Sequence, residues 1–146
     1  METASVRRVL AVKPDGPWLV IVGGAWTVES LNAGTDTPFE RSRTWLLPLL
    51  ERPRAEVESE AGQLLGPGDP DLAEALRSVV QRGLTAWSDY WILMTMPWMV
   101  AGEVELFAAL LREIALEQKW SPATRHGARR LLKQHGLWST DHRPMP

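Results

Sequence analysis

The fold is decided by residues 69–99, DPDLAEALRSVVQRGLTAWSDYWILMTMPWM. Asp69 followed by Pro70 predicts a helix start, because proline lacks only an N–H that would be unpaired in the first turn. We expect one continuous helix over 70–95. Its apolar side, spaced at helical intervals, consists of Leu72, Leu76, Val80, Leu84, Trp87, Trp91, Met94 and Trp98.

The second half of this helix is apolar on its other sides as well, with Tyr90, Ile92 and Leu93. A helix that is apolar all round is enclosed by other elements, so the stretch predicts the centre of the molecule. Asp89 stands in this apolar half. We expect its carboxylate to pair with an arginine or to reach the solvent edge. Burial would instead raise its pKa and make it a site candidate.

A β element is expected over 5–31. A first strand leads into a turn at 13–17, where proline and glycine stand at positions that turns favour. Residues 18–22 form a short apolar run, which is typical of a strand covered on both faces. Gly23-Gly24 allows a bend or bulge, and 26–31 alternates as a third strand does. A hairpin or meander of this size needs helices packed against it.

Proline marks the helix boundaries in the rest of the chain. Thr37-Pro38 predicts a helix start with a capping box. Pro48 is expected to kink or end that helix, and Pro53 is expected to begin a short one over 55–65. The inward-facing residues of this short helix are expected to be Val57, Ala61, Leu64 and Leu65.

Two more helices are expected after a turn at Pro97, since the residue before proline is pushed out of the α region. One runs over 100–119. The last begins at Ser121-Pro122 and ends near Gly136, which stands where a helix-terminating glycine belongs. The apolar stripe of the 100–119 helix consists of Val100, Val104, Phe107, Leu110, Leu111 and Ile114.

These elements together predict an α+β fold, in which an N-terminal β-hairpin or three-stranded meander packs on a bundle of four to five helices. At 146 residues the chain is most simply a single domain. We expect the β element over 5–31, the helical bundle over 37–136 and a tail over 139–146.

The composition is that of an ordinary soluble domain, with 45% hydrophobic and 23% charged residues. The chain has no cysteine, which excludes disulfides and thiolate metal sites. The uncharged run 90–102 contains Pro97 and is shorter than the roughly 20 residues that a membrane span needs. No secretory signal is visible. We therefore expect a cytoplasmic protein without membrane contact, and the excess of arginine over lysine suggests a bacterial source.

Tryptophan is the compositional anomaly, with eight residues against two Phe and one Tyr. One interpretation is that all eight are core and boundary residues. A second is that several anchor a binding partner, because tryptophan is enriched at binding hot spots. The candidates for partner binding are Trp87, Trp91, Trp98, Trp120 and Trp138. A third interpretation is a ligand pocket that contains Trp87, Asp89 and Trp91.

The last helix carries a basic face. Arg125, Arg129 and Lys133 recur at intervals of four residues, and Arg130 lies beside them. Such a face is typical of proteins that bind the phosphate backbone of nucleic acids. The alternative is a solvated face whose positive charges balance the acidic remainder of the chain.

Catalytic and metal-binding signals are weak. Glu113 and Glu117, four residues apart, could form a carboxylate pair, but they lack the Glu-x-x-His motif of helical di-metal sites. No phosphate-binding loop or nucleophile motif is present. We therefore expect no enzyme, no cofactor and no metal.

The function that the sequence favours is non-enzymatic recognition of another protein or of a second copy of this chain. An inhibitor, an immunity factor and an assembly adaptor all fit this description. Nucleic-acid binding through the last helix and small-ligand binding in a tryptophan-lined pocket are the alternatives.

Overall fold

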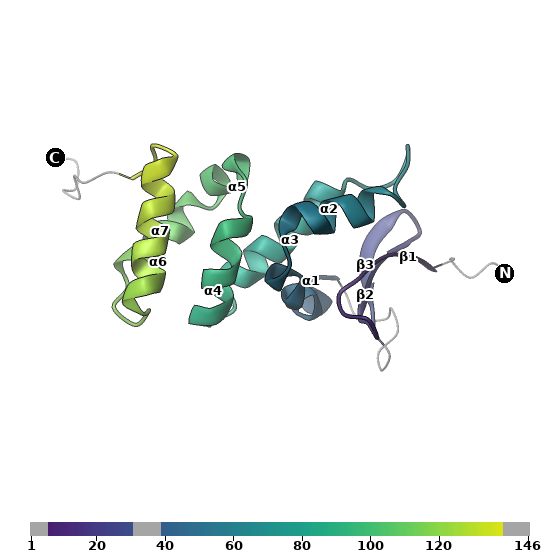
Figure 1. Ribbon diagram of the computed structural model, residues 1–146, viewed down its shortest axis with the longest axis horizontal. Helices are drawn as coiled ribbons and strands as arrows, with labels where there is room; N and C mark the ends of the chain where they lie inside the picture. The colour runs from purple at the N-terminus through teal and green to yellow at the C-terminus, as the bar shows by residue number, and fades with distance from the viewer. Residues whose placement is uncertain (1–5, 31–38, 139–146) are drawn as a thin grey trace. The chain divides into compact units, whose positions relative to one another are not determined.

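The computed structural model describes residues 6–30 and 39–138, and the chain divides into two compact units between Gly83 and Leu84. We call them the N-terminal unit and the C-terminal unit. The fold is α+β, as predicted: a three-stranded antiparallel sheet precedes all of the helices (Figure 1). The prediction that residues 1–146 form a single domain stays a prediction.

The sheet is the predicted three-stranded meander. Its strands, in the spatial order β1-β2-β3, are β1 (Val6–Ala11), β2 (Trp18–Val22) and β3 (Ala25–Glu29). Gly23 and Gly24 have φ angles of 60° and 78°, and Val22 pairs with Ala25 across them. Positive φ at both central residues defines the two-residue hairpin turn that suits twisted strands. The two glycines therefore make a tight turn, not a bulge.

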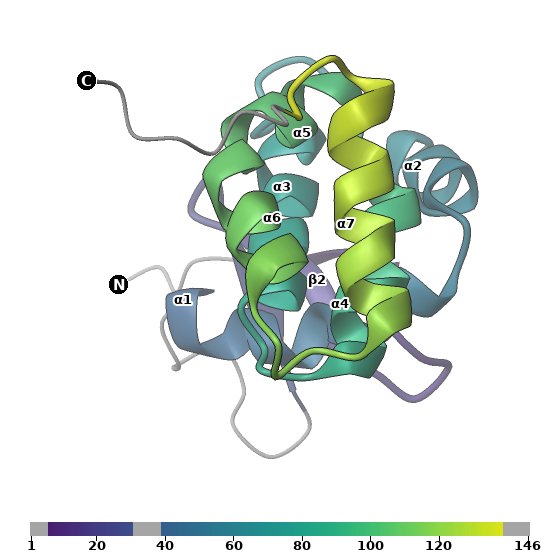
Figure 2. The ribbon, with the colours of Figure 1, turned by 90° about the vertical axis from the view of Figure 1, so that its left-hand side faces the viewer.

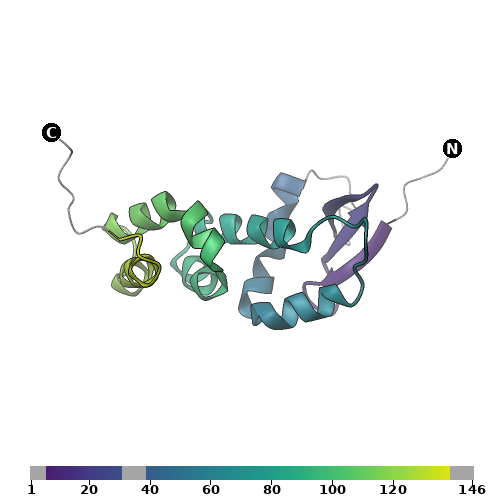
Figure 3. The same ribbon diagram turned by 90° about the horizontal axis from the view of Figure 1, so that it is seen from above.

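Helices of the N-terminal unit pack on one side of this sheet (Figures 1 and 3). They are α1 (Phe39–Ser42), the 3₁₀ helix η1 (Arg43–Glu51), α2 (Arg54–Gly62) and α3 (Leu72–Leu84). Pro48 lies inside η1, which replaces the α-helix expected there. The predicted helix start at Thr37-Pro38 lies outside the described residues.

The α2 helix begins directly after Pro53, and Val57 and Ala61 are buried, as predicted. The helix ends at Gly62, however, and not at residue 65. Because the chain has left the helix by then, Leu64 does not follow the apolar stripe inward and is exposed.

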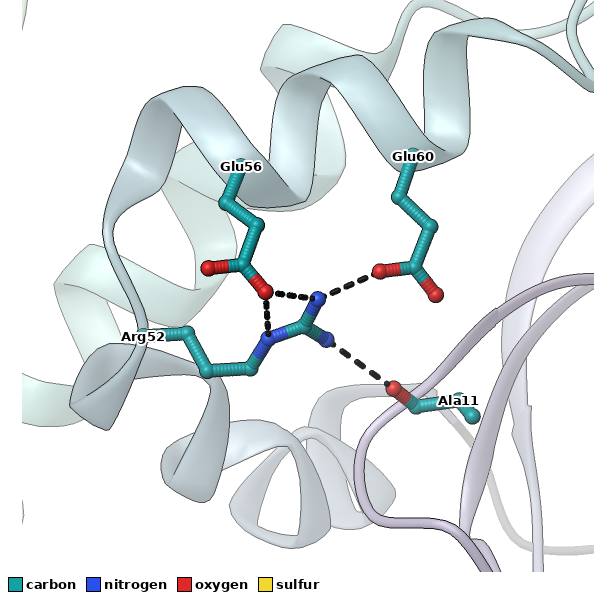
Figure 4. Close-up of polar contacts among 4 residues, drawn as sticks. All are labelled: Ala11, Arg52, Glu56 and Glu60. Atoms are coloured by element: carbon teal, nitrogen blue, oxygen red, sulfur yellow. Dashed lines mark hydrogen bonds and ion pairs between the residues drawn. The ribbon is translucent and has the colours of Figure 1, made fainter.

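Arg52 fastens α2 to the end of β1 (Figure 4). Its guanidinium bonds the Glu56 carboxylate at 2.9 Å, contacts Glu60, and donates at 3.4 Å to the carbonyl of Ala11. The hydrogen bond to Glu60 is the main reason that the pKa of Arg52 lies above its ordinary value. A planar guanidinium can serve several acceptors at once, so a single residue ties the helix to the strand.

The start of α3 corrects the prediction for Asp69. The residue before the helix is Asp71, and its carboxylate accepts the Ala73 N–H at 3.1 Å. Asp69 instead bonds the Arg7 guanidinium and the Gly66 N–H. The hydrogen bond from Arg7 is the main reason that the pKa of Asp69 lies below its ordinary value. Two aspartates flank Pro70, and the structure uses the second one as the cap.

The continuous helix predicted over 70–95 is wrong. The α3 helix ends at Leu84, and α4 (Asp89–Thr95) begins after an interruption. Trp87 has a φ of 57°, which no right-handed helix contains. Ser88 is extended, and its hydroxyl accepts the Trp91 N–H at 3.3 Å. A serine cap therefore starts a new helix within the stretch.

The C-terminal unit is helical. Its elements are α4, the 3₁₀ helix η2 (Met96–Trp98), α5 (Ala101–Leu106), α6 (Ala108–Leu116) and α7 (Pro122–Gln134). Figure 2 shows α6 and α7 side by side. Their shared interior contains Leu111, Ile114, Ala128 and Leu132, which are all buried.

The helix predicted over 100–119 is also divided. Phe107, with φ −102° and ψ 19°, separates α5 from α6, and α6 ends at Leu116. Val104, Leu111 and Ile114 of the predicted stripe are buried, whereas Val100 lies before the helix and is exposed. Breaks of this kind turn the four to five expected helices into seven shorter α-helices and two 3₁₀ helices in the described residues.

The boundaries predicted for the last helix are confirmed. The Ser121 hydroxyl accepts the Thr124 N–H at 3.3 Å, and Pro122 occupies the first turn. At the other end Gly136 has a φ of 68°, and the Leu137 N–H donates to the Leu132 carbonyl at 2.8 Å. This is the pattern of a glycine-terminated helix. No helix within 6–30 and 39–138 has the length and apolar character to cross a bilayer.

Candidate functional site

Trp87 is the most unusual residue of the C-terminal unit. It is the one described residue other than glycine with a positive φ, and it is 73% exposed. A bulky residue in the left-handed region costs about 1–3 kcal/mol of strain, and such residues cluster at functional sites. The strain here is not offset by burial of the ring. The exposed position also differs from the inward position that the helical stripe predicted.

Trp120 and Lys119 accompany this ring. The two indole centroids lie 6.3 Å apart at an interplanar angle of 40°. The Lys119 Nζ atom lies 3.8 Å from the Trp87 centroid and 5.2 Å from the Trp120 centroid. The same ammonium pairs with the Glu117 carboxylate at 2.9 Å. We call Trp87, Lys119, Trp120 and Glu117 the indole site.

A hollow of about 110 Å³ opens beside these four residues. Leu84 and Leu110 contribute apolar walls, and Glu113 adds a second carboxylate. The lining therefore offers two indole faces, two carboxylates and one ammonium. Aromatic faces beside charged groups are suited to binding another molecule. No cluster of three or more potential metal ligands exists in the part of the chain that the structure describes. That Glu113 and Glu117 form a solvated pair without a metal stays a prediction.

Asp89 explains how the indole site is assembled. Its carboxylate Oδ1 accepts the Ser121 N–H at 3.0 Å and the Thr124 hydroxyl at 2.5 Å. The bond from Thr124 is the main cause that lowers the pKa of Asp89, and the Ser121 N–H adds to it. Asp89 follows Trp87 by two residues, and Ser121 follows Trp120 directly. The carboxylate therefore joins the two segments that carry the two indoles.

Asp89 was expected to pair with an arginine or to reach the solvent edge; it has no arginine partner among the described residues, and it is half-buried. It stands in the first turn of α4 and not in the middle of an apolar helix, because the helix restarts at this point. A carboxylate in a first turn is favoured by the helix dipole and by the free N–H groups nearby. Neither Asp89 nor Trp91 lines the hollow beside Trp87, so the candidate pocket residues Trp87, Asp89 and Trp91 are not brought together around it.

The remaining tryptophan candidates are dispersed. Trp91 is half-buried and meets the exposed Tyr90 ring edge-on at 5.0 Å. Trp98 is only 4% exposed and belongs to the interior. Trp138 is half-buried, and the Arg129 guanidinium lies 5.1 Å from its ring centre. Of the five candidates, Trp87 and Trp120 are the pair that lines one hollow.

The basic residues of α7 differ in their contacts. Arg125 donates at 3.1 Å to the carbonyl of Trp120, which fixes the indole site further. Arg129 is directed to Trp138. Arg130 and Lys133 are exposed, on the side of α7 opposite its buried residues. The four candidates are thus divided between internal contacts and solvent.

Arg130 also borders a second hollow of about 430 Å³ along α7. Leu93, Met96 and Pro97 form its apolar wall, while His126 and Arg130 are on its polar side. Gly127 lies against the end of the Met96 side chain, since a Cβ at that position would come within 2.6 Å of the Met96 Cε atom.

Sequence reasoning missed Lys119 and Thr124 as members of the site. Ser121-Pro122 signalled the start of α7, and that helix start is where Asp89 binds. No local signal connects Lys119 to Trp87, because the contact depends on how α4 and α7 pack. No protein-family model, characterised protein or solved structure matches this chain.

Proposed function

We propose that this chain is a non-enzymatic protein-recognition module whose principal anchor is Trp87. The observation that supports the proposal is the 73% exposure of this residue at a backbone position that is strained for tryptophan. A large ring that adds little to the interior and requires strain is better explained by a contact outside the unit.

The surroundings of Trp87 favour this role. The neighbouring Trp120 indole restricts the ring before any partner arrives. A restricted side chain loses less entropy on binding, and tryptophan supplies a large contact area through few rotatable bonds. Trp98 is left out of the proposed contact surface because it is buried.

For the source, the compartment and the partner, the proposal follows the expectations from the sequence. We propose a bacterial cytoplasmic protein of the inhibitor, immunity or assembly-adaptor type, whose partner is another protein or a second copy of this chain. The lack of cysteine is compatible with a reducing compartment.

In-cell photo-crosslinking tests the proposal. A benzoylphenylalanine residue replaces Trp87 in one variant and Leu64, which is 57% exposed in the N-terminal unit, in the control. We expect a covalent adduct of defined mass from position 87 that is absent from position 64. An adduct of twice the chain mass would identify a second copy as the partner. Failure to form an adduct at 87, or the same adduct at both positions, would contradict the proposal.

Nucleic-acid binding is the second candidate function. The observation that favours it is that Arg130 and Lys133 are exposed and have no ion-pair partner among the described residues. Phosphate groups would complement two such cations.

A further inference from the structure

We infer that the indole site recognises a cationic side chain, a lysine or an arginine, presented by the protein partner, and that Lys119 occupies the site in the free protein. This inference rests on the proposed function, since it names the chemistry of the partner that Trp87 contacts.

The first argument is that the site already holds a cation. The Lys119 ammonium lies over the Trp87 face at 3.8 Å and within 5.2 Å of the Trp120 ring centre. Electron-rich indole faces attract cations, and tryptophan does so more strongly than tyrosine or phenylalanine. The intramolecular contact thus shows the kind of group that the two rings accommodate.

The second argument is charge. Glu113 and Glu117 both line the hollow, and Lys119 pairs with Glu117. Glu113 has no ion-pair partner among the described residues. The lining therefore carries one more carboxylate than its own ammonium neutralises, and a further cation would complement it.

The third argument is size. The hollow of about 110 Å³ is well below the roughly 300–1,000 Å³ that is typical of pockets for small-molecule ligands. It suits the end of one side chain. The alternative to cation recognition is that the Lys119 contact is permanent. A partly exposed lysine on a flexible stem, however, is easily exchanged for another cation.

An NMR titration of the full chain tests the inference with choline as the probe. Its neutral isostere 3,3-dimethylbutan-1-ol is the control ligand, at constant ionic strength. We expect choline, and not the alcohol, to shift the indole Nε1–H signals of Trp87 and Trp120 in a saturable manner. Trp87→Ala should abolish the Trp120 shift.

Lys119→Met is the decisive variant, because it removes the resident cation. We expect choline to bind about twofold to fivefold more tightly, the factor that a surface cation–π contact supplies. Lys133→Met, with the same charge change on α7 but outside the site, should leave choline binding unchanged.

Equal shifts from choline and the alcohol, or unchanged or weaker choline binding in Lys119→Met, would overturn the inference. Crosslinking at position 87 without selectivity for choline would preserve protein recognition and reject the cation. Selective choline binding without any crosslink would reject the protein partner. The two proposals can therefore fail separately.

Discussion

The Lys119 Nζ atom lies 3.8 Å from the centre of the Trp87 indole ring, although α4, η2, α5 and α6 separate the two residues in the chain. Asp89 brings the two segments together through its bonds to Ser121 and Thr124. A cation therefore lies over one face of the ring, while the residue as a whole remains largely exposed to solvent.

The backbone at position 87 gives the first prediction. Trp87→Gly should be more stable than Trp87→Ala by about 1 kcal/mol, because glycine adopts a positive φ without the clash of a Cβ atom. Urea unfolding of the two variants measures the difference. A more stable alanine variant would show that the left-handed conformation at this position is not strained.

The lowered pKa of Asp89 gives the second prediction. Its folded pKa lies below its unfolded value of about 3.9, so the stability that it contributes is present above that pH. This stability is lost as the pH falls through the folded pKa. Asp89→Asn should lower the Tm at pH 6 and flatten its dependence on pH between pH 6 and pH 3. Thr124→Val, which removes the main hydrogen-bond donor to Asp89, should also make the Tm less dependent on pH. A profile as steep as that of the wild type in both variants would refute this account of Asp89.

Gly127 gives the third prediction. Alanine in a helix interior is favoured over glycine by about 1 kcal/mol, but a Cβ at Gly127 would displace the Met96 Cε atom. Gly127→Ala should therefore stabilise less than the helix propensity suggests. Met96→Ala combined with Gly127→Ala should recover the difference in a double-mutant cycle of unfolding free energies. Gly102→Ala, in the first turn of α5 with no atom within 4 Å of its Cβ, is a control without a steric neighbour. An additive cycle would mean that Met96 does not restrict position 127.

The nucleic-acid alternative gives the fourth prediction. If Arg130 and Lys133 contact phosphates, the affinity for labelled DNA or RNA must fall steeply between about 50 and 200 mM salt. Replacing both residues by glutamine should then weaken binding and reduce the salt dependence. Our primary proposal expects no such binding at low salt. Salt-dependent binding that disappears in the double variant would make nucleic acid the favoured partner.

Sequence patterns predicted the sheet and the last helix because their signals are local. Two adjacent glycines fix a tight hairpin turn, and Ser121-Pro122 fixes a helix start. The single long helix failed because its apolar periodicity continues through an interruption. Ser88 carried a capping signal, but the periodicity of the flanking residues masked it.

The candidate site was predictable only in part. Trp87 and Trp120 stood out by residue type, whereas their pairing and the roles of Lys119 and Thr124 depend on tertiary packing. Trp98 illustrates the limit of residue type, since it shares the predicted stripe with Trp87 and lies in the interior.

The central claim is that the Trp87 indole serves a contact outside the unit and adds little to folding. The most direct test is the free energy of unfolding of Trp87→Ala by urea denaturation. Because alanine keeps the backbone constraint and Trp87 is 73% exposed, we expect a loss below about 1 kcal/mol. A loss of about 3–5 kcal/mol, as for truncation of a core tryptophan, would contradict the claim.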